Sequence, residues 1–150
     1  MWIQRDISAL ITKLCANRPA LLLTGARQTG KSSLLQRLFP EQPYVSLDIP
    51  LNAKQASESG QFFLESRGAP LTIDEIQYAP ELFRQIKIKI DQHRQLTGQY
   101  IMTGSQKFSL MKGVSESLAG RIAILNLHSL SAKELQNHYK TELTANQILE

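Results

Sequence analysis

The chain has 150 residues, of which 42% are hydrophobic, so one globular domain with a buried core fits this length and a second does not. The single cysteine excludes a disulfide framework and a cluster of thiol metal ligands, and the net charge of +4 is mild. No apolar run approaches the roughly 20 residues of a membrane span. Charged residues near the N-terminus argue against a secretory signal, so we expect a cytoplasmic protein with no membrane contact.

The pattern of apolar residues predicts helices and strands in alternation. Apolar residues recur at helical spacing over 2–14, and Pro19 closes that element before the first strand. Residues 82–90 also present one apolar helical face, although every second residue from Ile86 to Ile90 is isoleucine, as in a strand. We choose the helix because βα alternation requires one here. The other predicted elements are strands over 20–24, 44–49, 71–75, 100–103 and 121–127, and helices over 33–38, 52–67 with a break near Gly60, and 105–118.

Strands that alternate with helices indicate an α/β fold. Right-handed crossovers between such strands produce a parallel sheet with helices on both faces, which makes three layers. Near the C-terminus, Ser131 and Glu134 form a capping-box pattern, which predicts a helix through about Tyr139. Ligands of these sheets bind at the carboxyl ends of the strands, so we expect the functional residues there.

An octapeptide after the first strand matches the phosphate-binding pattern G-x-x-x-x-G-K-[ST]: Gly25-Ala26-Arg27-Gln28-Thr29-Gly30-Lys31-Ser32. Glycines at its first and sixth positions let backbone N–H groups turn toward phosphates, and the N-terminus of the next helix favours the same negative charge. We expect the backbone through Ser33 to bind phosphates, Lys31 to reach the β- and γ-phosphates, and Ser32 to ligate Mg²⁺. The pattern therefore predicts a nucleoside triphosphate site.

Two adjacent carboxylates end the strand predicted over 71–75. We expect Asp74 to hold Mg²⁺ through water and Glu75 to orient or deprotonate the attacking water, because adjacent residues of an extended chain point opposite ways. The Asp-Glu pair, with no Asn-Lys-x-Asp motif in the sequence, favours ATP over GTP. A whole strand lies between the two motifs, so we expect 100–103 to separate their strands in the sheet.

Two further segments offer groups for the transferred phosphate. Thr103-Gly104-Ser105 leaves a strand at the same edge, so Ser105, or as second choice Thr103, is expected near the γ-phosphate and the attacking water. The same residues are also ordinary turn formers. Arg121 follows a glycine that ends a helix. It is a candidate to stabilise charge on the phosphoryl group, either in the same chain or in a neighbour.

At these residues the chain resembles a family of the AAA+ superfamily. Its members are AAA-type ATP-binding proteins of bacteria and archaea that often carry a restriction-nuclease-like domain of unknown function after the ATPase core. The resemblance covers roughly residues 1 to 137. It is carried by the phosphate loop, the segment 71–77, Met102-Thr103-Gly104-Ser105, Ala119-Gly120-Arg121 and Leu130-Ser131-x-x-Glu134.

The resemblance implies a five-stranded parallel sheet of order 5-1-4-3-2 and ATP with Mg²⁺ as ligands. It implies the roles given above for Asp74, Glu75, Ser105 and Arg121. It also implies an AAA-type P-loop ATPase core over 1–140, followed at 141–150 by a tail or the start of a lid region. A lid commonly closes over adenine and contributes a second arginine. We therefore expect either that this sequence is the core of a longer protein, or that another copy of the chain or a partner protein supplies a lid or an arginine.

The function that fits these residues best is a Mg²⁺-dependent ATP-binding module, a slow ATPase whose nucleotide state changes its contacts with itself or a partner. One alternative is a non-catalytic ATP-binding adaptor for nucleic acid or protein. It is motivated by a basic stretch, which is also typical of a solvated helix face: Arg84, Lys87, Lys89, His93 and Arg94. The other alternative is a P-loop kinase, although no compact Arg-x-x-x-Arg lid is present in the sequence.

Overall fold

Helices and strands alternate along the chain. The structure is a computed structural model that describes residues 2–105 and 108–140, so the tail or lid segment expected at 141–150 lies outside the described residues. In chain order the elements are α1 (Ser8–Asn17), β1 (Ala20–Thr24), α2 (Lys31–Leu38), β2 (Tyr44–Ser46), α3 (Pro50–Glu58), α4 (Gly60–Arg67), β3 (Leu71–Asp74), η1 (Ile76–Tyr78), α5 (Leu82–Gln92), β4 (Tyr100–Gly104), α6 (Phe108–Leu118), β5 (Ile122–Asn126) and α7 (Ala132–His138).

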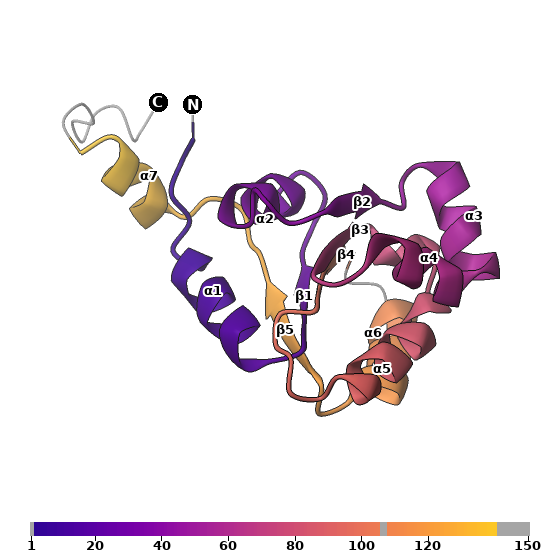
Figure 1. Cartoon of the computed structure of the whole chain (residues 1–150). Helices are drawn as coiled ribbons and strands as arrows, with labels where there is room; N and C mark the ends of the chain where they lie inside the picture. The colour runs from indigo at the N-terminus through magenta and orange to yellow at the C-terminus, as the bar shows by residue number, and fades with distance from the viewer. Residues whose placement is uncertain (1, 106–107, 141–150) are drawn as a thin grey trace.

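The five strands form one parallel sheet in the order β2-β3-β4-β1-β5 (Figure 1). The expected α/β class and strand order are therefore confirmed. All five residues of β1 are buried, and alternation along the strand sends Leu21 and Leu23 to one face and Leu22 to the other. Because the strands are parallel, their carboxyl ends meet at one edge, where Thr24 lies beside Gly104.

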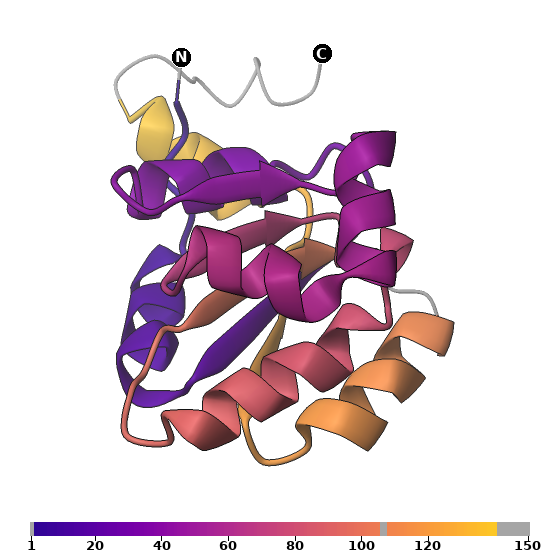
Figure 2. The same cartoon turned by 45° about the vertical axis from the view of Figure 1, so that its right-hand side comes forward.

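Two helical layers cover the sheet, as Figures 1 and 2 show. On one face, α1 and α2 contribute Ile11 and Leu34 to a buried cluster with Leu21. The helices α3, α4, α5 and α6 cover the other face, where Phe63 and Phe83 belong to the larger buried cluster. Among the residues that the structure describes, no helix combines the length and apolar character needed to cross a membrane.

Two elements are shorter than the apolar pattern predicts. Helix α1 begins at Ser8, whereas Trp2 lies in a nonhelical segment and packs against the smaller cluster. Trp2 therefore continues the apolar pattern because it is packed against the core, and not because it is helical. Strand β2 ends at Ser46, whose Oγ accepts a hydrogen bond from the N–H of Asp48. Pro50 then begins α3. A proline favours an extended conformation in the residue before it, and here the chain leaves the sheet.

Phe62 and Phe63 are adjacent on α4, but Phe63 is fully buried whereas Phe62 is 62% exposed. We expect Phe63→Ala to lower the free energy of unfolding by about 3–5 kcal/mol, because the truncation leaves a cavity under α4. The matched substitution Phe62→Ala should change it by less than about 0.5 kcal/mol. Urea denaturation followed by circular dichroism measures both values. Equal destabilisation by the two substitutions would contradict the orientation of α4.

Candidate functional site

The expected phosphate loop connects β1 to α2 at the carboxyl edge of the sheet. Two of its glycines have backbone conformations that other residues rarely adopt. Gly25 has φ of 148°, and a Cβ at this position would lie 2.3 Å from the carbonyl oxygen of Leu127. Gly30 has φ of 87° and forms the N-cap of α2. Glycine at these two positions therefore lets the loop turn tightly and lie directly against the segment that follows β5.

Lys31 is the first residue of α2 and is buried. Its Nζ donates hydrogen bonds to the carbonyl oxygens of Gly25, at 3.0 Å, and Ala26, at 2.8 Å. The lysine side chain thus folds back along the loop, so its ammonium group is held against the loop backbone. A positive charge at this place suits the binding of an anionic group.

Asp74 lies at the end of β3 and accepts hydrogen bonds from hydroxyl groups of three other elements, α2, β4 and β2. Its Oδ1 accepts hydrogen bonds from Ser32 Oγ at 2.5 Å and from Thr103 Oγ1 at 2.6 Å, and its Oδ2 accepts one from Ser46 Oγ at 3.3 Å. Carboxylate and hydroxyl oxygens are hard ligands of the kind that Mg²⁺ prefers. The side chains of Ser32 and Asp74 are brought together by the fold and fit the expected cation, although they lie 42 positions apart in the sequence.

Tyr44 of β2 also faces this carboxylate. Desolvation, followed by hydrogen bonding and the negative charge of Asp74, raises the pKa of the Tyr44 phenol above its ordinary value. The sequence analysis assigned Tyr44 only to a strand. A tyrosine at the start of a short edge strand carries no motif that would have identified it.

Glu75 does not continue the strand, which corrects the expectation that the strand extends through residue 75. Its φ of 59° is left-handed, and its N–H donates to Thr103 Oγ1 at 3.0 Å. The Glu75 carboxylate accepts a hydrogen bond from Gln77 Nε2, and the Ser105 N–H donates to Gln77 Oε1 at 3.3 Å. Gln77 therefore bridges the carboxylate to Ser105, a role that the sequence analysis did not assign to it.

Ser105 follows β4 at the same edge of the sheet. Its Oγ is buried and finds no hydrogen-bond partner in the part of the chain that the structure describes. A buried hydroxyl is ordinarily paired with protein, water or a ligand. Its position and its free hydrogen-bonding capacity are those of a group that could contact a ligand at the loop.

Arg121 lies at the opposite end of the sheet from the phosphate loop, because it immediately precedes β5 whereas the loop follows β1. Its Nε and Nη2 donate to the two carboxylate oxygens of Asp91 at 2.8 and 3.1 Å. Hydrogen bonding from Arg121 lowers the pKa of Asp91, so this pair is ionised. The structure therefore contradicts the expectation that Arg121 acts at the site of its own chain. A role for Arg121 in a neighbouring copy of the chain stays a prediction.

The basic stretch lies on α5 and just after it. Two of its cations have acidic neighbours: Lys89 Nζ is 2.7 Å from Glu65 Oε1, and Arg94 Nε is 3.8 Å from Asp91 Oδ1. These contacts partly neutralise the positive charge of this face. Nucleic-acid contact by α5 stays a prediction.

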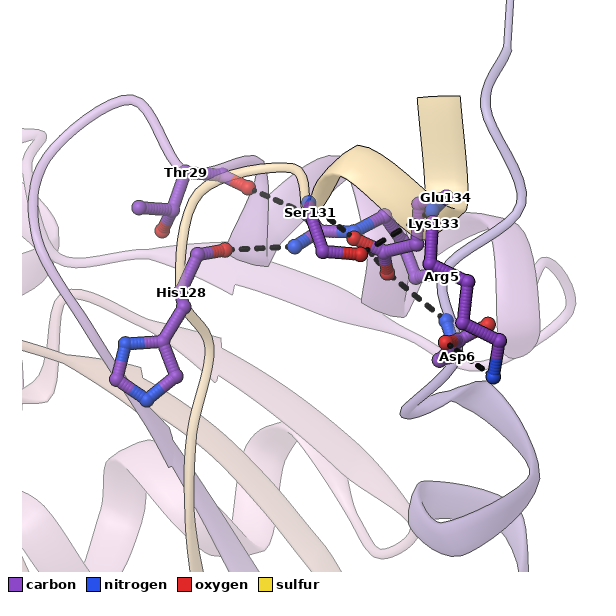
Figure 3. Close-up of polar contacts among 7 residues, drawn as sticks. All are labelled: Arg5, Asp6, Thr29, His128, Ser131, Lys133 and Glu134. Carbon is purple, nitrogen blue, oxygen red and sulfur yellow. Dashed lines mark hydrogen bonds and ion pairs between the residues drawn. The ribbon is translucent and has the colours of Figure 1, made fainter. Parts of the chain in front are cut away.

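Arg5 is a residue near the loop that the sequence analysis missed. It is buried, and its guanidinium donates to Glu134 Oε1 at 3.0 Å, to the Thr29 carbonyl at 2.9 Å and to the His128 carbonyl at 2.6 Å (Figure 3). The capping box around Glu134 was readable from its local pattern. Its arginine partner was not, because it lies 129 positions away.

Glu134 is buried as well, and three groups donate to its carboxylate. The N–H of Asp6 donates to Oε1 at 2.9 Å together with Arg5, and the N–H of Ser131 donates to Oε2 at 2.8 Å. Burial alone would raise the pKa of Glu134, but the hydrogen bonds from Ser131, Asp6 and Arg5 outweigh it and lower the pKa to about 2. The carboxylate is therefore ionised across the physiological range.

A cavity of about 680 Å³ opens beside the phosphate loop, a volume typical of small-molecule sites. Trp2 and Ile3 form part of its wall, and Gly30 and Ser33 contribute from the loop and the start of α2. The guanidinium of Arg37 lies 4.9 Å from the centre of the Trp2 ring, a cation–π contact that holds the indole at this place. The cavity thus joins an aromatic wall to the phosphate loop.

Known proteins resemble this chain in sequence and in fold. A model of the protein family described as AAA domain matches residues 17–136. The uncharacterized protein Rv2008c of Mycobacterium tuberculosis is 29% identical over 134 residues, which cover 88% of this chain and 30% of that protein. This chain therefore spans about 30% of the length of that curated relative.

Two solved structures share the fold. The Walker-type ATPase PABY2304 of Pyrococcus abyssi aligns with a TM-score of 0.65 and 19% identity over 98% of this chain and 61% of its own. DnaA from Aquifex aeolicus, solved with bound AMPPCP, aligns with a TM-score of 0.58 and 16% identity over 95% of this chain and 52% of its own. At these identities the similarity concerns the fold alone.

The low pKa of Glu134 makes the free energy of unfolding depend on pH. Because the pKa falls from an ordinary value of 4.5 to about 2 on folding, its stabilising contribution is complete above about pH 4.5 and is lost as the pH falls toward 2. We expect wild-type protein to exceed Glu134→Gln in urea midpoint at pH 7, with a difference that narrows steadily below pH 4.5. Midpoints measured at pH 7, 5, 4 and 3 test this. A constant difference across the series would show that Glu134 keeps its ordinary pKa.

Proposed function

This chain belongs to the AAA domain family, and from that premise we propose that it is a Mg²⁺-dependent ATP-binding module that hydrolyses ATP slowly. The observation that carries the proposal is the position of Asp74, whose carboxylate accepts the hydroxyl hydrogens of Ser32 and Thr103 beside the phosphate loop. Ser32 at the end of the phosphate loop contacts a carboxylate from a separate strand. This arrangement fits a nucleoside triphosphate with a bound metal ion.

In this proposal the backbone N–H groups from Gly25 to Ser33 surround the phosphates, and the Lys31 ammonium exchanges its loop carbonyls for phosphate oxygens. Ser32 and Asp74 hold Mg²⁺, which would neutralise charge on the phosphates when bound. The other residues of the site act on water and on the γ-phosphate in this proposal. Glu75 orients or deprotonates the attacking water, with Gln77 holding its carboxylate.

Ser105 contacts the γ-phosphate or the attacking water in this proposal, and Thr103 acts mainly on Asp74. Support for the first role comes from the buried Oγ of Ser105, which finds no partner among the described residues. Arg121 would act only from a second copy of the chain, because Asp91 holds it at the far end of the sheet. Release from Asp91 would then accompany that contact.

The nucleoside is proposed to occupy the cavity beside the loop. Trp2 and Ile3 provide an apolar wall, and the cavity reaches Gly30 and Ser33, next to the expected phosphate position. Stacking of adenine on Trp2 would use an indole that Arg37 already holds in place. This arrangement favours a nucleotide over a simple polyphosphate as the ligand.

The nucleotide state would control contacts with another copy or with a partner that supplies a lid, and we propose a cytoplasmic setting for this activity. The relative from M. tuberculosis is much longer than this chain. As the sequence resemblance implies, we propose that a restriction-nuclease-like domain follows the ATPase core in longer members of the family.

Substitutions at Lys31 and Glu75 should affect ATP binding and ATP hydrolysis differently. We expect Lys31→Ala to abolish detectable binding of a fluorescent ATP analogue with Mg²⁺, because it removes the cation of the loop. Glu75→Gln should bind with near-normal affinity and release phosphate at least about 100-fold more slowly, since it loses the group that activates water. Exposed Lys54→Ala serves as the control for Lys31.

Phosphate release in the absence of any acceptor distinguishes an ATPase from a kinase. Wild-type turnover in Glu75→Gln would refute the role of Glu75. Equal nucleotide affinity in Lys31→Ala and wild type would refute the site itself. Phosphate transfer that requires an added acceptor would favour the kinase alternative.

The base-binding cavity has its own test. We expect Trp2→Ala to weaken ATP binding by roughly 5- to 150-fold, the range for loss of one base–aromatic stacking contact. Binding of inorganic tripolyphosphate with Mg²⁺ should stay unchanged, because it has no base. Isothermal titration calorimetry measures both ligands. A parallel loss for ATP and tripolyphosphate would show that Trp2 supports the loop and does not contact the base.

A further inference from the structure

Arg5 contacts the phosphate loop from outside every recognised motif. Its Nη1 donates to the carbonyl oxygen of Thr29 at 2.9 Å, and Thr29 immediately precedes the second glycine of the loop. The side chain is 7% exposed, so this hydrogen bond is shielded from water. A charged donor that is buried against one loop carbonyl holds that peptide group strongly.

The Thr29 carbonyl also determines where the next N–H points. In a planar trans peptide the C=O of one residue and the N–H of the next point in opposite directions. Arg5 holds the Thr29 carbonyl on its own side, so the Gly30 N–H is directed to the other side of the same peptide plane. Gly30 has a left-handed φ, and glycine can adopt many other backbone conformations. The hydrogen bond from Arg5 therefore restricts the orientation of a peptide group that the glycine itself leaves free to rotate.

The same guanidinium joins the loop to two segments from the end of the chain. Nη2 donates to the His128 carbonyl, just after β5, and Nε donates to Glu134 in α7 (Figure 3). Arg5 and Glu134 are both buried, and removal of either one would leave a charge without its partner. The loop and α7 are thus held by one buried ion pair whose two halves depend on each other.

We propose that Arg5 is a positioning residue of the phosphate loop and that, through Glu134, it couples nucleotide binding at the loop to the docking of α7. This inference rests on the proposed nucleotide binding and deepens it by naming a route of regulation. Coupling between two sites is reciprocal. Nucleotide should therefore stabilise docked α7, and loosening α7 should weaken nucleotide binding.

Affinity is the first measurement. The variants Arg5→Lys and Glu134→Gln are titrated with a fluorescent ATP analogue and Mg²⁺. Lysine keeps the charge but cannot reach three acceptors with a planar fork. We expect the dissociation constant to rise by about 10- to 100-fold in each variant, as for loss of one charge-assisted hydrogen bond. In the combined variant the two effects should be far from additive, because both substitutions break the same connection.

The exposed pair between Lys133 and Asp6 offers a matched control. Lys133 Nζ lies 3.4 Å from Asp6 Oδ2, so it joins the same N-terminal segment to the same helix without touching the loop. Lys133→Met should therefore leave the dissociation constant within about twofold of wild type, since an exposed ion pair contributes little.

Hydrogen–deuterium exchange of residues 131–138 provides the readout that a merely structural role would not change. In wild type and in Lys133→Met, saturating ATP with Mg²⁺ should slow this exchange. In Arg5→Lys, nucleotide at a concentration that fills the site should leave it unchanged. Wild-type affinity in Arg5→Lys, or ATP-dependent protection of α7 that persists there, would overturn the inference.

Three further outcomes bear on the inference. If Arg5→Lys does not fold, as judged by circular dichroism, Glu134→Gln alone decides, with the same expected losses of affinity and protection. If wild-type protein binds no nucleotide, the proposed function and this inference fall together. Wild-type binding with unchanged behaviour of both variants would overturn the coupling and leave the proposed function intact.

Discussion

The carboxylate of Asp74 is the interaction on which the candidate site depends. It accepts hydrogen bonds from Ser32 at the start of α2 and from Thr103 in β4, and so ties the phosphate loop to two neighbouring strands. These groups can meet because β4 lies between β3 and β1 in a parallel sheet, where all carboxyl ends share one edge. In the proposed function, a cation would take the place of the hydrogen bond between Ser32 and Asp74.

A second connection supports the loop from its other side. Arg5 reaches the Thr29 carbonyl and is itself held by Glu134, so the N-terminal segment and α7 both contribute to the loop's geometry. The close approach of Leu127 to Gly25 adds a steric constraint at the opposite end of the loop. The loop therefore lies between the polar edge around Asp74 and the charged contact of Arg5, which also lines the cavity beside the loop.

Much of the fold was predictable because its determinants are local. The apolar run of β1 and the glycine-lysine pattern after it act within a few residues, and the alternation of elements led to the confirmed sheet. Errors arose where local patterns serve a distant contact. Trp2 fits the helical spacing of the apolar residues but lies outside α1 and packs against the buried cluster. Glu75 was predicted to end a strand but has a left-handed φ, and its N–H donates to Thr103.

The sequence alone determined where a turn with the phosphate-binding pattern follows a strand, that a carboxylate would end another strand, and which class of sheet would hold them, because each depends on neighbours along the chain. Only the tertiary structure decided that Gln77 bridges Glu75 to Ser105, that Arg121 lies far from the loop, and that Arg5 is bound to Glu134. Such pairings follow from how distant segments pack, and neither partner carries a local signal of the other.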